Sequence, residues 1–405
     1  MIQTTRRTKK LGVLTGGGDV PGLNAAIKAI VYRADVLECQ VLGLRAGWQG
    51  ISYLDRARDI DALSFRDTDE ATWKGGYLLP LNRLNTRDID RAGGTILQST
   101  RTNPARIRVS DLPPHLCKYG KGHAADEHVD LTPEVLANID FLGLDGLIVI
   151  GGDDTLSYAS VLKKHGVPVW GIPKTMDNDV PGTDYCIGFQ TAIHRAAESV
   201  DRIRSTAGSH RETILFRLFG RDAGFTALET AIAAWVDRVL IPEVPADISR
   251  LAELVEHDRR NPAGYSLVVL SEGANLGVPV PEEGPPDAYG HRKKTNVAEF
   301  LADELHHLMP NVRFLPVDLT YILRSGEPDV YDKRMAIFYA NVVMGLVEKG
   351  VHGVMAGHRD GEFVYTDIPG KEYPPRRVDP ADYNSMRYRP SFERITGVFK
   401  PQISR

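Results

Sequence analysis

The fold is decided by residues 11–24, which read LGVLTGGGDVPGLN. The apolar run 11–15 predicts a strand, and the spacing of the apolar residues after it predicts a helix over 21–34 with Pro21 at its N1 position. Glycines between the two let the backbone approach an anion, and a helix N-terminus offers unpaired N–H groups. The spacing is neither G-x-G-x-x-G nor that of a Walker A loop. Taken alone, the segment could be only a tight turn that caps a helix.

The rest of the chain alternates short apolar runs with stretches of helical period, which is typical of a parallel α/β sheet. Further strands are predicted at 41–44, 146–150, 167–172, 213–219, 266–270 and 312–317, and helices at 156–164, 192–205, 226–236, 297–308 and 333–348. The strands are mostly apolar throughout, so helices should cover both faces of the sheet. A length of 405 residues favours two domains. The polar segments 111–131 and 279–294 are interpreted as surface excursions.

Composition excludes some classes of protein. The chain has 49 Lys and Arg against 53 Asp and Glu, a net charge of −4 with no long run of one sign, which argues against a nucleic-acid coat. The three cysteines, Cys39, Cys117 and Cys186, form no C-x-x-C pair, which argues against a disulfide framework or a thiolate zinc site. The apolar run after the basic residues 1–10 is too short for a secretory signal. We therefore expect a cytoplasmic protein.

Two carboxylates follow one of the predicted strands. Gly151 and Gly152 are followed by Asp153, Asp154 and Thr155, directly after the apolar run 146–150. Open α/β sheets bind their ligands at the carboxyl ends of strands, and Mg²⁺ is typically held by one or two carboxylates plus phosphate oxygens. The segment therefore suits a magnesium-phosphate site. The alternative is that one Asp only caps a helix that opens at Leu156.

A second polar segment, PKTMDND at residues 173–179, follows the apolar run 167–172. Asp177 and Asp179 could supply a general base and a partner that orients it, and Lys174 a cation for phosphoryl charge. Such a loop could also be only solvated surface. Its place after a neighbouring strand favours a function.

Arginines and acids also gather at later strand ends. They lie in RLFGR at 217–221, SEG at 271–273 and YILR at 321–324. Arginine binds phosphate in a bidentate manner, and a glutamate can accept hydrogen bonds from sugar hydroxyls. Taken singly, each arginine could be structural.

Together these segments resemble a known family. GGGDVPGLN, GGDDT, PKTMDND, FGRDAG and SEG occur in the order and approximate spacing of the phosphofructokinases, from residue 11 to about 345. The resemblance implies two similar Rossmann-like, three-layer α/β domains with mainly parallel sheets and an active site in the cleft between them. It places the phosphoryl donor in a domain of residues 1–188 plus about 323–373, and fructose 6-phosphate in a domain of 189–322 plus the C-terminal segment. It also implies a homodimer or homotetramer in which some arginines cross the interface.

The resemblance also implies roles for single residues. Asp177 would remove the proton from the sugar 1-hydroxyl, with Asp179 and Thr175 positioning it, Lys174 and Arg221 offsetting charge, and Asp153 holding Mg²⁺. The donor would be bound by Gly17, Arg101, Asp153, Asp154 and Thr155. The sugar phosphate would be bound by Thr175, Arg211, Phe219, Gly220, Arg221, Glu272, Tyr321 and Arg324.

Asp154 and Lys174 determine the expected donor. Family members that use ATP usually carry glycine at the position of Asp154 and often at that of Lys174, whereas pyrophosphate-dependent members resemble this chain at both. A carboxylate at 154 would crowd and repel the α-phosphate of a nucleotide. Lys174 could stabilise charge on the transferred and leaving phosphates. The resemblance thus predicts a Mg²⁺-dependent pyrophosphate–fructose 6-phosphate 1-phosphotransferase that yields fructose 1,6-bisphosphate and phosphate and runs in both directions, in glycolysis or gluconeogenesis.

Alternatives stay open at this point. The donor could be ATP, the acceptor could include sedoheptulose 7-phosphate, or the chain could be a catalytically silent regulatory subunit. Arg211 lies one place before the expected arginine, and Glu212 takes that position. Tyr321 stands where the allosteric bacterial enzymes have histidine, and Arg313 is an offset candidate for a further interface arginine. These departures argue against inherited allostery.

Overall fold

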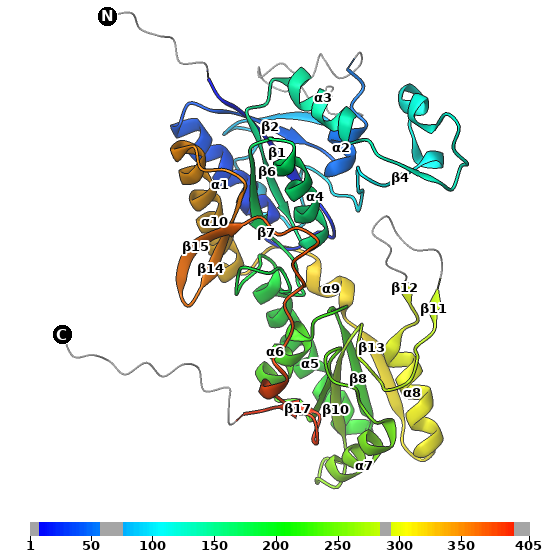
Figure 1. Cartoon of the computed structure of the whole chain (residues 1–405). Coiled ribbons are helices and arrows are strands. Elements are labelled where there is room, and N and C mark those ends of the chain that lie inside the picture. Colours follow the sequence, from blue (N-terminus) through cyan, green and yellow to red (C-terminus); the bar gives the residue numbers. More distant parts are fainter. Residues whose placement is uncertain (1–7, 57–75, 284–292, 393–405) are drawn as a thin grey trace, which may run out of the picture.

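The computed structural model describes residues 8–56, 76–283 and 293–392 and contains two separate open sheets with helices on their faces (Figure 1). The first sheet has the strand order β15-β14-β7-β6-β1-β2-β3. Its five inner strands are parallel, and the edge strands β15 and β3 are antiparallel to their neighbours. The strands are β1 (Lys10–Thr15), β2 (Gln40–Leu44), β3 (Leu78–Leu81), β6 (Gly146–Gly151), β7 (Val169–Pro173), β14 (Val354–Arg359) and β15 (Glu362–Asp367).

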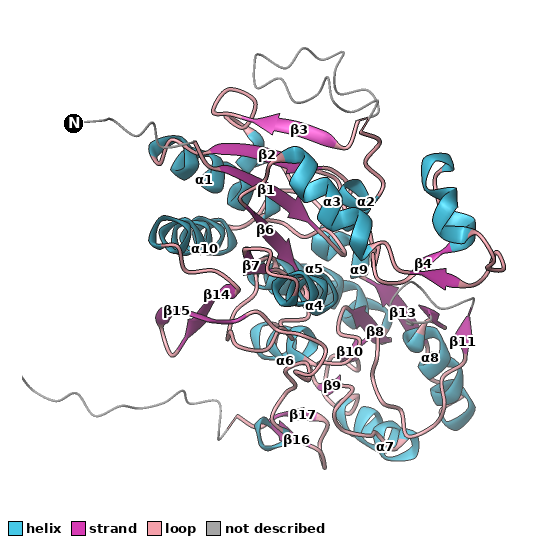
Figure 2. Ribbon diagram, turned by 45° about the horizontal axis from the view of Figure 1, so that its top comes forward, coloured by secondary structure: helices cyan, strands magenta, loops and turns pink. Residues whose placement is uncertain are grey.

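The inner strands of the first sheet are apolar on both faces because helices cover both faces. Along β6, Ile148 and Ile150 belong to the cluster packed under α1 and α10, whereas Leu147 and Val149 belong to the cluster under α3 and α4. Figure 2 shows α1 and α10 on one side of the sheet and α3 and α4 on the other. The helices of this sheet are α1 (Leu23–Val36), α2 (Trp48–Ser52), α3 (Thr132–Leu142), α4 (Asp153–Lys164) and α10 (Val330–Lys349).

The second sheet is smaller and parallel throughout, with the order β13-β8-β10-β9. Its strands are β8 (Thr213–Leu218), β9 (Arg238–Leu240), β10 (Ser266–Ser271) and β13 (Phe314–Asp318). Its helices are α5 (Phe189–His210), α6 (Phe225–Ala233), α7 (Ile248–Asp258), α8 (Val297–Leu308) and α9 (Thr320–Arg324). The α/β architecture that the sequence predicts is confirmed, and the chain returns to the first sheet through α10, β14 and β15.

Several predicted boundaries were wrong. Helix α1 begins at Leu23 with Gly22 as its N-cap, so Pro21 lies before the helix instead of at N1. Helix α4 begins at Asp153, three residues earlier than predicted, and its N-cap is Gly152. Neither Asp therefore caps a helix at Leu156; both lie in the first turn of α4, where the helix dipole favours negative charge.

The polar excursion at 111–131 is partly ordered into short elements. They are β4 (Ile107–Arg108), η4 (Val109–Asp111), η5 (Pro114–Gly120) and β5 (His128–Val129), and they enclose a small apolar cluster around Leu116. Of the excursion at 279–294 only the ends are described, where β11 (Glu282–Glu283) pairs with β12 (Lys293–Lys294). Residues 284–292 lie outside the described part, and so do residues 1–7 of the basic N-terminal segment. Among the described residues, no helix is long and apolar enough to cross a membrane.

Gly22 joins the loop after β1 to α1 at a place where a side chain does not fit. Its φ is 108°, a left-handed conformation, and an added Cβ would lie 2.6 Å from Cγ2 of Ile187. Ile187 is buried beside the second polar segment. The glycine thus allows α1 to begin directly against the chain that follows β7.

We expect Gly22→Ala to lower the melting temperature more than Gly166→Ala. Gly166 has a φ of 82° but nothing within 4 Å of an added Cβ, so its substitution tests the backbone conformation alone, at about 1 kcal/mol. The clash with Ile187 adds an overpacking cost of about 1–3 kcal/mol. Thermal denaturation of both variants measures the difference, and equal shifts would show that Ile187 simply moves aside.

Candidate active site

The glycine loop after β1 is held on two sides by backbone hydrogen bonds. Gly16 donates its N–H to the carbonyl of Ile150 at 3.0 Å, and Gly17 donates to that of Thr100 at 3.0 Å. The hydroxyl of Ser99 donates to the carbonyl of Gly17 at 2.5 Å. An added Cβ on Gly16 would lie 2.7 Å from Oγ1 of Thr155, so the loop lies tightly on the first turn of α4.

A buried lysine lies under this loop. Nζ of Lys174, at the end of β7, donates to the carbonyls of Gly16 at 2.8 Å and Gly18 at 2.6 Å. Burial lowers the pKa of Lys174 to about 8, with Asp19 and Asp153 opposing the shift. At neutral pH the ammonium group is therefore still mostly protonated. It places one positive charge directly behind the glycine loop.

Two carboxylates follow in the same segment; Asp179 is buried and Asp177 is partly exposed. Desolvation and, after it, the charge of Glu272 raise the pKa of Asp177 to about 7, although the N–H and the charge of Arg221 act in the opposite direction. That N–H donates to Oδ2 of Asp177 at 3.2 Å. Burial, together with the charges of Asp177 and Asp153, raises the pKa of Asp179 well above its usual value. A carboxylate that titrates near neutrality can accept a proton from a substrate.

The second sheet brings a charged cluster to the same place. Arg217 at the end of β8 contacts Asp318 at 2.6 Å and Glu272 at 3.4 Å. Burial by itself would lower the pKa of Arg221. The negative charges of Asp177, Glu272 and Asp154 outweigh this effect, so that the pKa of Arg221 is raised. The charge of Asp154 in α4 thus acts across the gap between the two sheets.

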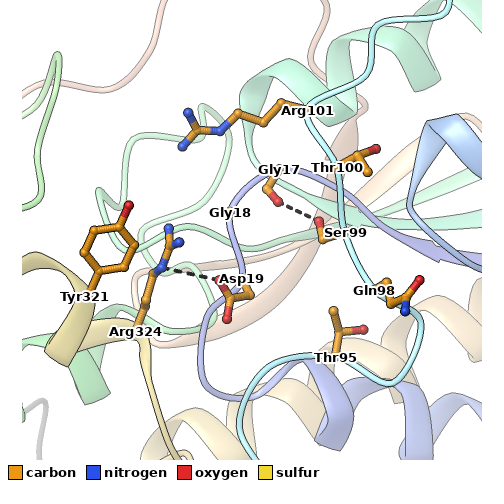
Figure 3. Close-up of a pocket in the computed structure, with 10 residues that line it drawn as sticks. All are labelled: Gly17, Gly18, Asp19, Thr95, Gln98, Ser99, Thr100, Arg101, Tyr321 and Arg324. Carbon is orange, nitrogen blue, oxygen red and sulfur yellow. Dashed lines mark hydrogen bonds and ion pairs between the residues drawn. The ribbon is translucent and has the colours of Figure 1, made fainter. Parts of the chain in front are cut away.

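A cavity of about 480 Å³ opens between the glycine loop and α9. Figure 3 shows Arg324 reaching toward Asp19, to which its Nε lies at 3.4 Å, while Arg101 extends from the other wall. Arg324 also stacks on Tyr321, 4.7 Å from the ring centre. The lining residues are Gly17, Gly18, Asp19, Thr95, Gln98, Ser99, Thr100, Arg101, Tyr321 and Arg324.

The arrangement can bind an anion beside a carboxylate that is able to accept a proton. A glycine loop with a buried cation behind it and arginines in front can bind phosphate groups. A carboxylate with a pKa near 7, such as that of Asp177, can take a proton from a hydroxyl. A family model described as "Phosphofructokinase" matches residues 10–347. The chain belongs to the phosphofructokinase family.

Relatives in this family differ in the donor that their names give. The chain is 34% identical over 381 residues to a "Pyrophosphate–fructose 6-phosphate 1-phosphotransferase" of Dictyoglomus thermophilum, covering 93% of this chain and 97% of the relative. It is 35% identical over 358 residues to "ATP-dependent 6-phosphofructokinase 3" of Streptomyces coelicolor, covering 87% and 89%. The structure of a pyrophosphate-dependent phosphofructokinase from Marinobacter aquaeolei matches with a TM-score of 0.70 at 17% identity, covering 95% of this chain and 89% of that one. At that identity the last match shows the fold alone.

Most of the residues that the family resemblance selected lie together in this phosphofructokinase. Contacts or charge effects link Gly17, Arg101, Asp153, Asp154, Lys174, Asp177, Asp179, Phe219, Arg221, Glu272, Tyr321 and Arg324. The hydroxyl of Thr175 accepts a bond from the N–H of Asp177 at 3.1 Å. The side chain of Thr155 packs under Gly16, and Gly220 has a φ of 126° that favours glycine.

Arg211 does not lie with the other predicted residues in this chain. It follows α5 as the C-cap and precedes β8, so it lies at the amino end of the strand whose carboxyl end carries Arg217. Its neighbour Glu212 is buried and pairs with Arg313 at 2.8 Å. Arg211 and Arg313 therefore both lie at the amino end of the second sheet, which points away from the cavity.

Some site residues were not selected from the sequence. Asp19 lies in the quoted glycine loop, and its pairing with Arg324 could have been suspected from its charge there. Arg217 lies at a strand end that the sequence did mark, but its role as the partner of Glu272 needed the strand order. Residues 95–100 follow no predicted strand, so nothing in the pattern indicated that they line the cavity.

We expect Asp177→Asn to melt at a higher temperature than the unchanged protein at pH 8. The folded-state pKa of about 7 exceeds the ordinary aspartate value of 3.8, so the free energy of unfolding falls as pH rises from about 4 to 7 and does not recover at higher pH. Below about pH 4 Asp177 is protonated in the folded and the unfolded state, so the rise in melting temperature from the neutral amide should vanish there. Melting curves from pH 4 to 8 measure it.

Asp201→Asn serves as the matched control, because Asp201 is an exposed carboxylate on α5. If the difference in melting temperature between Asp177→Asn and the unchanged protein stays constant with pH, the raised pKa of Asp177 is contradicted.

Proposed function

We propose that this phosphofructokinase takes its phosphoryl group from pyrophosphate and transfers it to the 1-hydroxyl of fructose 6-phosphate. Asp154 carries the proposal. It lies in the first turn of α4, and its charge raises the pKa of Arg221 across the cleft, so its carboxylate acts on the space where the reaction would occur. A carboxylate there repels the α-phosphate of a nucleotide, and pyrophosphate has no third phosphate that would meet it. The acceptor follows from the family.

The chemistry is in-line transfer with Asp177 as the base. The 1-hydroxyl oxygen bonds to phosphorus while the bridging P–O bond of pyrophosphate breaks, the hydroxyl proton passes to Asp177, and phosphate leaves. The N–H of Arg221 holds Oδ2 of Asp177 at 3.2 Å and so fixes the carboxylate. Lys174 offsets charge on the donor from behind the glycine loop, and Arg221 offsets it from the sugar side. Because one phosphoanhydride is consumed and only phosphate leaves, the reaction should run in both directions.

Asp153 is suited to hold Mg²⁺ on the donor. Its charge acts on Lys174, Asp177 and Asp179, so the carboxylate lies near all three. In the described ranges no three His, Cys, Asp or Glu side chains group as a metal cage. Mg²⁺ commonly binds through one or two carboxylates plus substrate phosphates, and a single Asp fits that mode. The bound ion would neutralise charge on the transferred phosphoryl group.

The remaining family expectations stay part of the proposal. These are a donor domain of residues 1–188 plus about 323–373, a sugar domain of 189–322 plus the C-terminal segment, a homodimer or homotetramer, and work in the cytoplasm in glycolysis or gluconeogenesis. Within a homo-oligomer, Arg211 and Arg313 would serve a neighbouring subunit's sugar site, since they lie away from the cavity of their own chain.

Initial rates of fructose 1,6-bisphosphate formation with pyrophosphate and with ATP, in parallel and with Mg²⁺, test the donor. We expect activity with pyrophosphate and little with ATP. In Asp154→Gly the ratio of kcat/KM for ATP to that for pyrophosphate should rise about tenfold or more, because the repulsion is removed.

Activity of the unchanged enzyme with ATP alone would overturn the donor assignment. An Asp154→Gly enzyme that keeps its pyrophosphate activity and gains none with ATP would show that Asp154 does not select the donor. If the enzyme is inactive on fructose 6-phosphate with both donors but active on sedoheptulose 7-phosphate, the proposed acceptor is wrong.

Asp177→Ala should lower kcat by about 10²–10⁴-fold and leave KM for fructose 6-phosphate nearly unchanged, because a base acts on the transition state more than on the bound substrate. Steady-state kinetics with the preferred donor measures both constants. Near-normal turnover in the variant would remove Asp177 from this role.

A further inference from the structure

The chain after β15 crosses from the first sheet to the second as a long strap, residues 368–391. Figure 1 shows it in orange and red, running from β15 past α6 to β17 (Arg389–Pro390). At its far end, the hydroxyl of Tyr383 donates to the carbonyl of Val239 at 2.7 Å, and the N–H of Val239 donates to the carbonyl of Tyr388 at 2.7 Å. The strap lies beyond residue 347, where the family model ends. It is therefore not among the motifs that identify the family.

Midway along, the strap binds the backbone of the two residues that follow Asp177. The N–H of Arg376 donates to the carbonyl of Asp179 at 2.7 Å, and its Nη1 donates to the carbonyl of Asn178 at 3.2 Å. Nη2 of Arg376 lies 4.0 Å from Oδ1 of Asp184. A guanidinium group that donates to backbone carbonyls forms a charge-assisted bond, which is stronger than a neutral one.

Asn178, which lies between the two carboxylates, adopts a left-handed backbone conformation. Its φ is 54°, in the left-handed region. Its side chain accepts from the N–H of Cys186 at 2.9 Å and donates to the carbonyl of Asp184 at 3.0 Å, which closes the loop 178–186. The carbonyls of Asn178 and Asp179 are then bound by Arg376. The chain between the two carboxylates is thus tied to the loop by one side chain and to the strap by another.

The guanidinium itself is held in place by α6. It lies over the ring of Phe225, 5.0 Å from the centre, and the next residue, Thr226, donates its hydroxyl to the carbonyl of Met176 at 2.6 Å. Oε1 of Glu243 accepts from the N–H of Gly224 at 2.9 Å and from that of Val378 at 2.8 Å. The first turn of α6, the strap and the segment 176–179 therefore form one connected unit.

We propose that Arg376 is a positioning residue that holds the Asn178–Asp179 peptide and so sets the carboxylate of Asp177 toward the sugar. This inference rests on the proposed role of Asp177 as base. Misplacement of a reacting group by about 1 Å can cost about a hundredfold in rate. Arg376 does not line the cavity, so its loss should change turnover more than substrate binding.

The test is Arg376→Ala with Arg377→Ala as control, since Arg377 is the exposed neighbour on the same strap. Both variants keep the backbone bond from residue 376 to Asp179. We expect Arg376→Ala to lower kcat about tenfold to a hundredfold, with KM for fructose 6-phosphate within about twofold, and Arg377→Ala to leave both constants unchanged. Steady-state kinetics uses whichever donor the unchanged enzyme prefers.

Chemical rescue gives a readout that a general loss of structure would not produce. The side chain of Arg376 is 27% exposed, so free guanidinium can enter the space that alanine leaves above Phe225. Millimolar guanidinium chloride should restore part of the kcat of Arg376→Ala, and sodium chloride at equal ionic strength should not. Unchanged kcat, a rise in KM that matches the fall in kcat, or absence of rescue would each overturn the proposal.

If Arg376→Ala does not fold, Arg376→Lys replaces it. Lysine keeps the charge but not the planar fork, so kcat should fall while KM stays constant, and an unchanged kcat would overturn the proposal. The two proposals fail separately. An active Asp177→Ala enzyme overturns the base, whereas normal turnover in Arg376→Ala overturns only the positioning role.

Discussion

The site depends on the buried ammonium group of Lys174. By donating to the carbonyls of Gly16 and Gly18, it joins the end of β7 to the loop after β1 across the intervening strand β6. Burying a charge is costly unless hydrogen bonds compensate for it, and here backbone carbonyls do so. The same contact turns the loop into an electropositive surface. Packing of the first sheet and preparation for an anionic ligand are therefore achieved by one side chain.

Several carboxylates lie near that cation. The charges of Asp19 and Asp153 act on it, and Asp177 follows three residues later in a place where desolvation favours its protonated form. On the facing sheet, Arg217 and Arg221 balance Glu272. Each sheet thus contributes positively and negatively charged side chains. Phosphate groups that enter between the sheets would replace carboxylates as partners of cations that are already paired.

The sequence predicted β1, β2, β6, β7, β8, β10 and β13, because runs buried on both faces leave a clear apolar pattern, but it missed the inner strand β14 and the short strand β9. It also missed β15, whose exposed face gives it a weak pattern, and β3, an edge strand that contains Pro80. It placed Lys174 and Asp177 correctly after β7, beside the end of β6 that leads into Asp153. It could not supply the partners that come from elsewhere in the chain, such as Asp19 for Arg324 or Arg376 for Asn178, since those contacts depend on how the two sheets face each other.

The return of the chain to the first sheet has a consequence for folding order. Residues 213–318 contain the whole second sheet, so that sheet can form from one continuous stretch as it leaves the ribosome. The first sheet lacks β14 until residues 354–359 have been made, and until then β7 exposes an unpaired edge. The nascent protein therefore exposes an unpaired strand edge from the synthesis of residue 173 until that of residue 354. Protection of this edge of β7 from other chains during that interval should therefore favour the yield of folded enzyme.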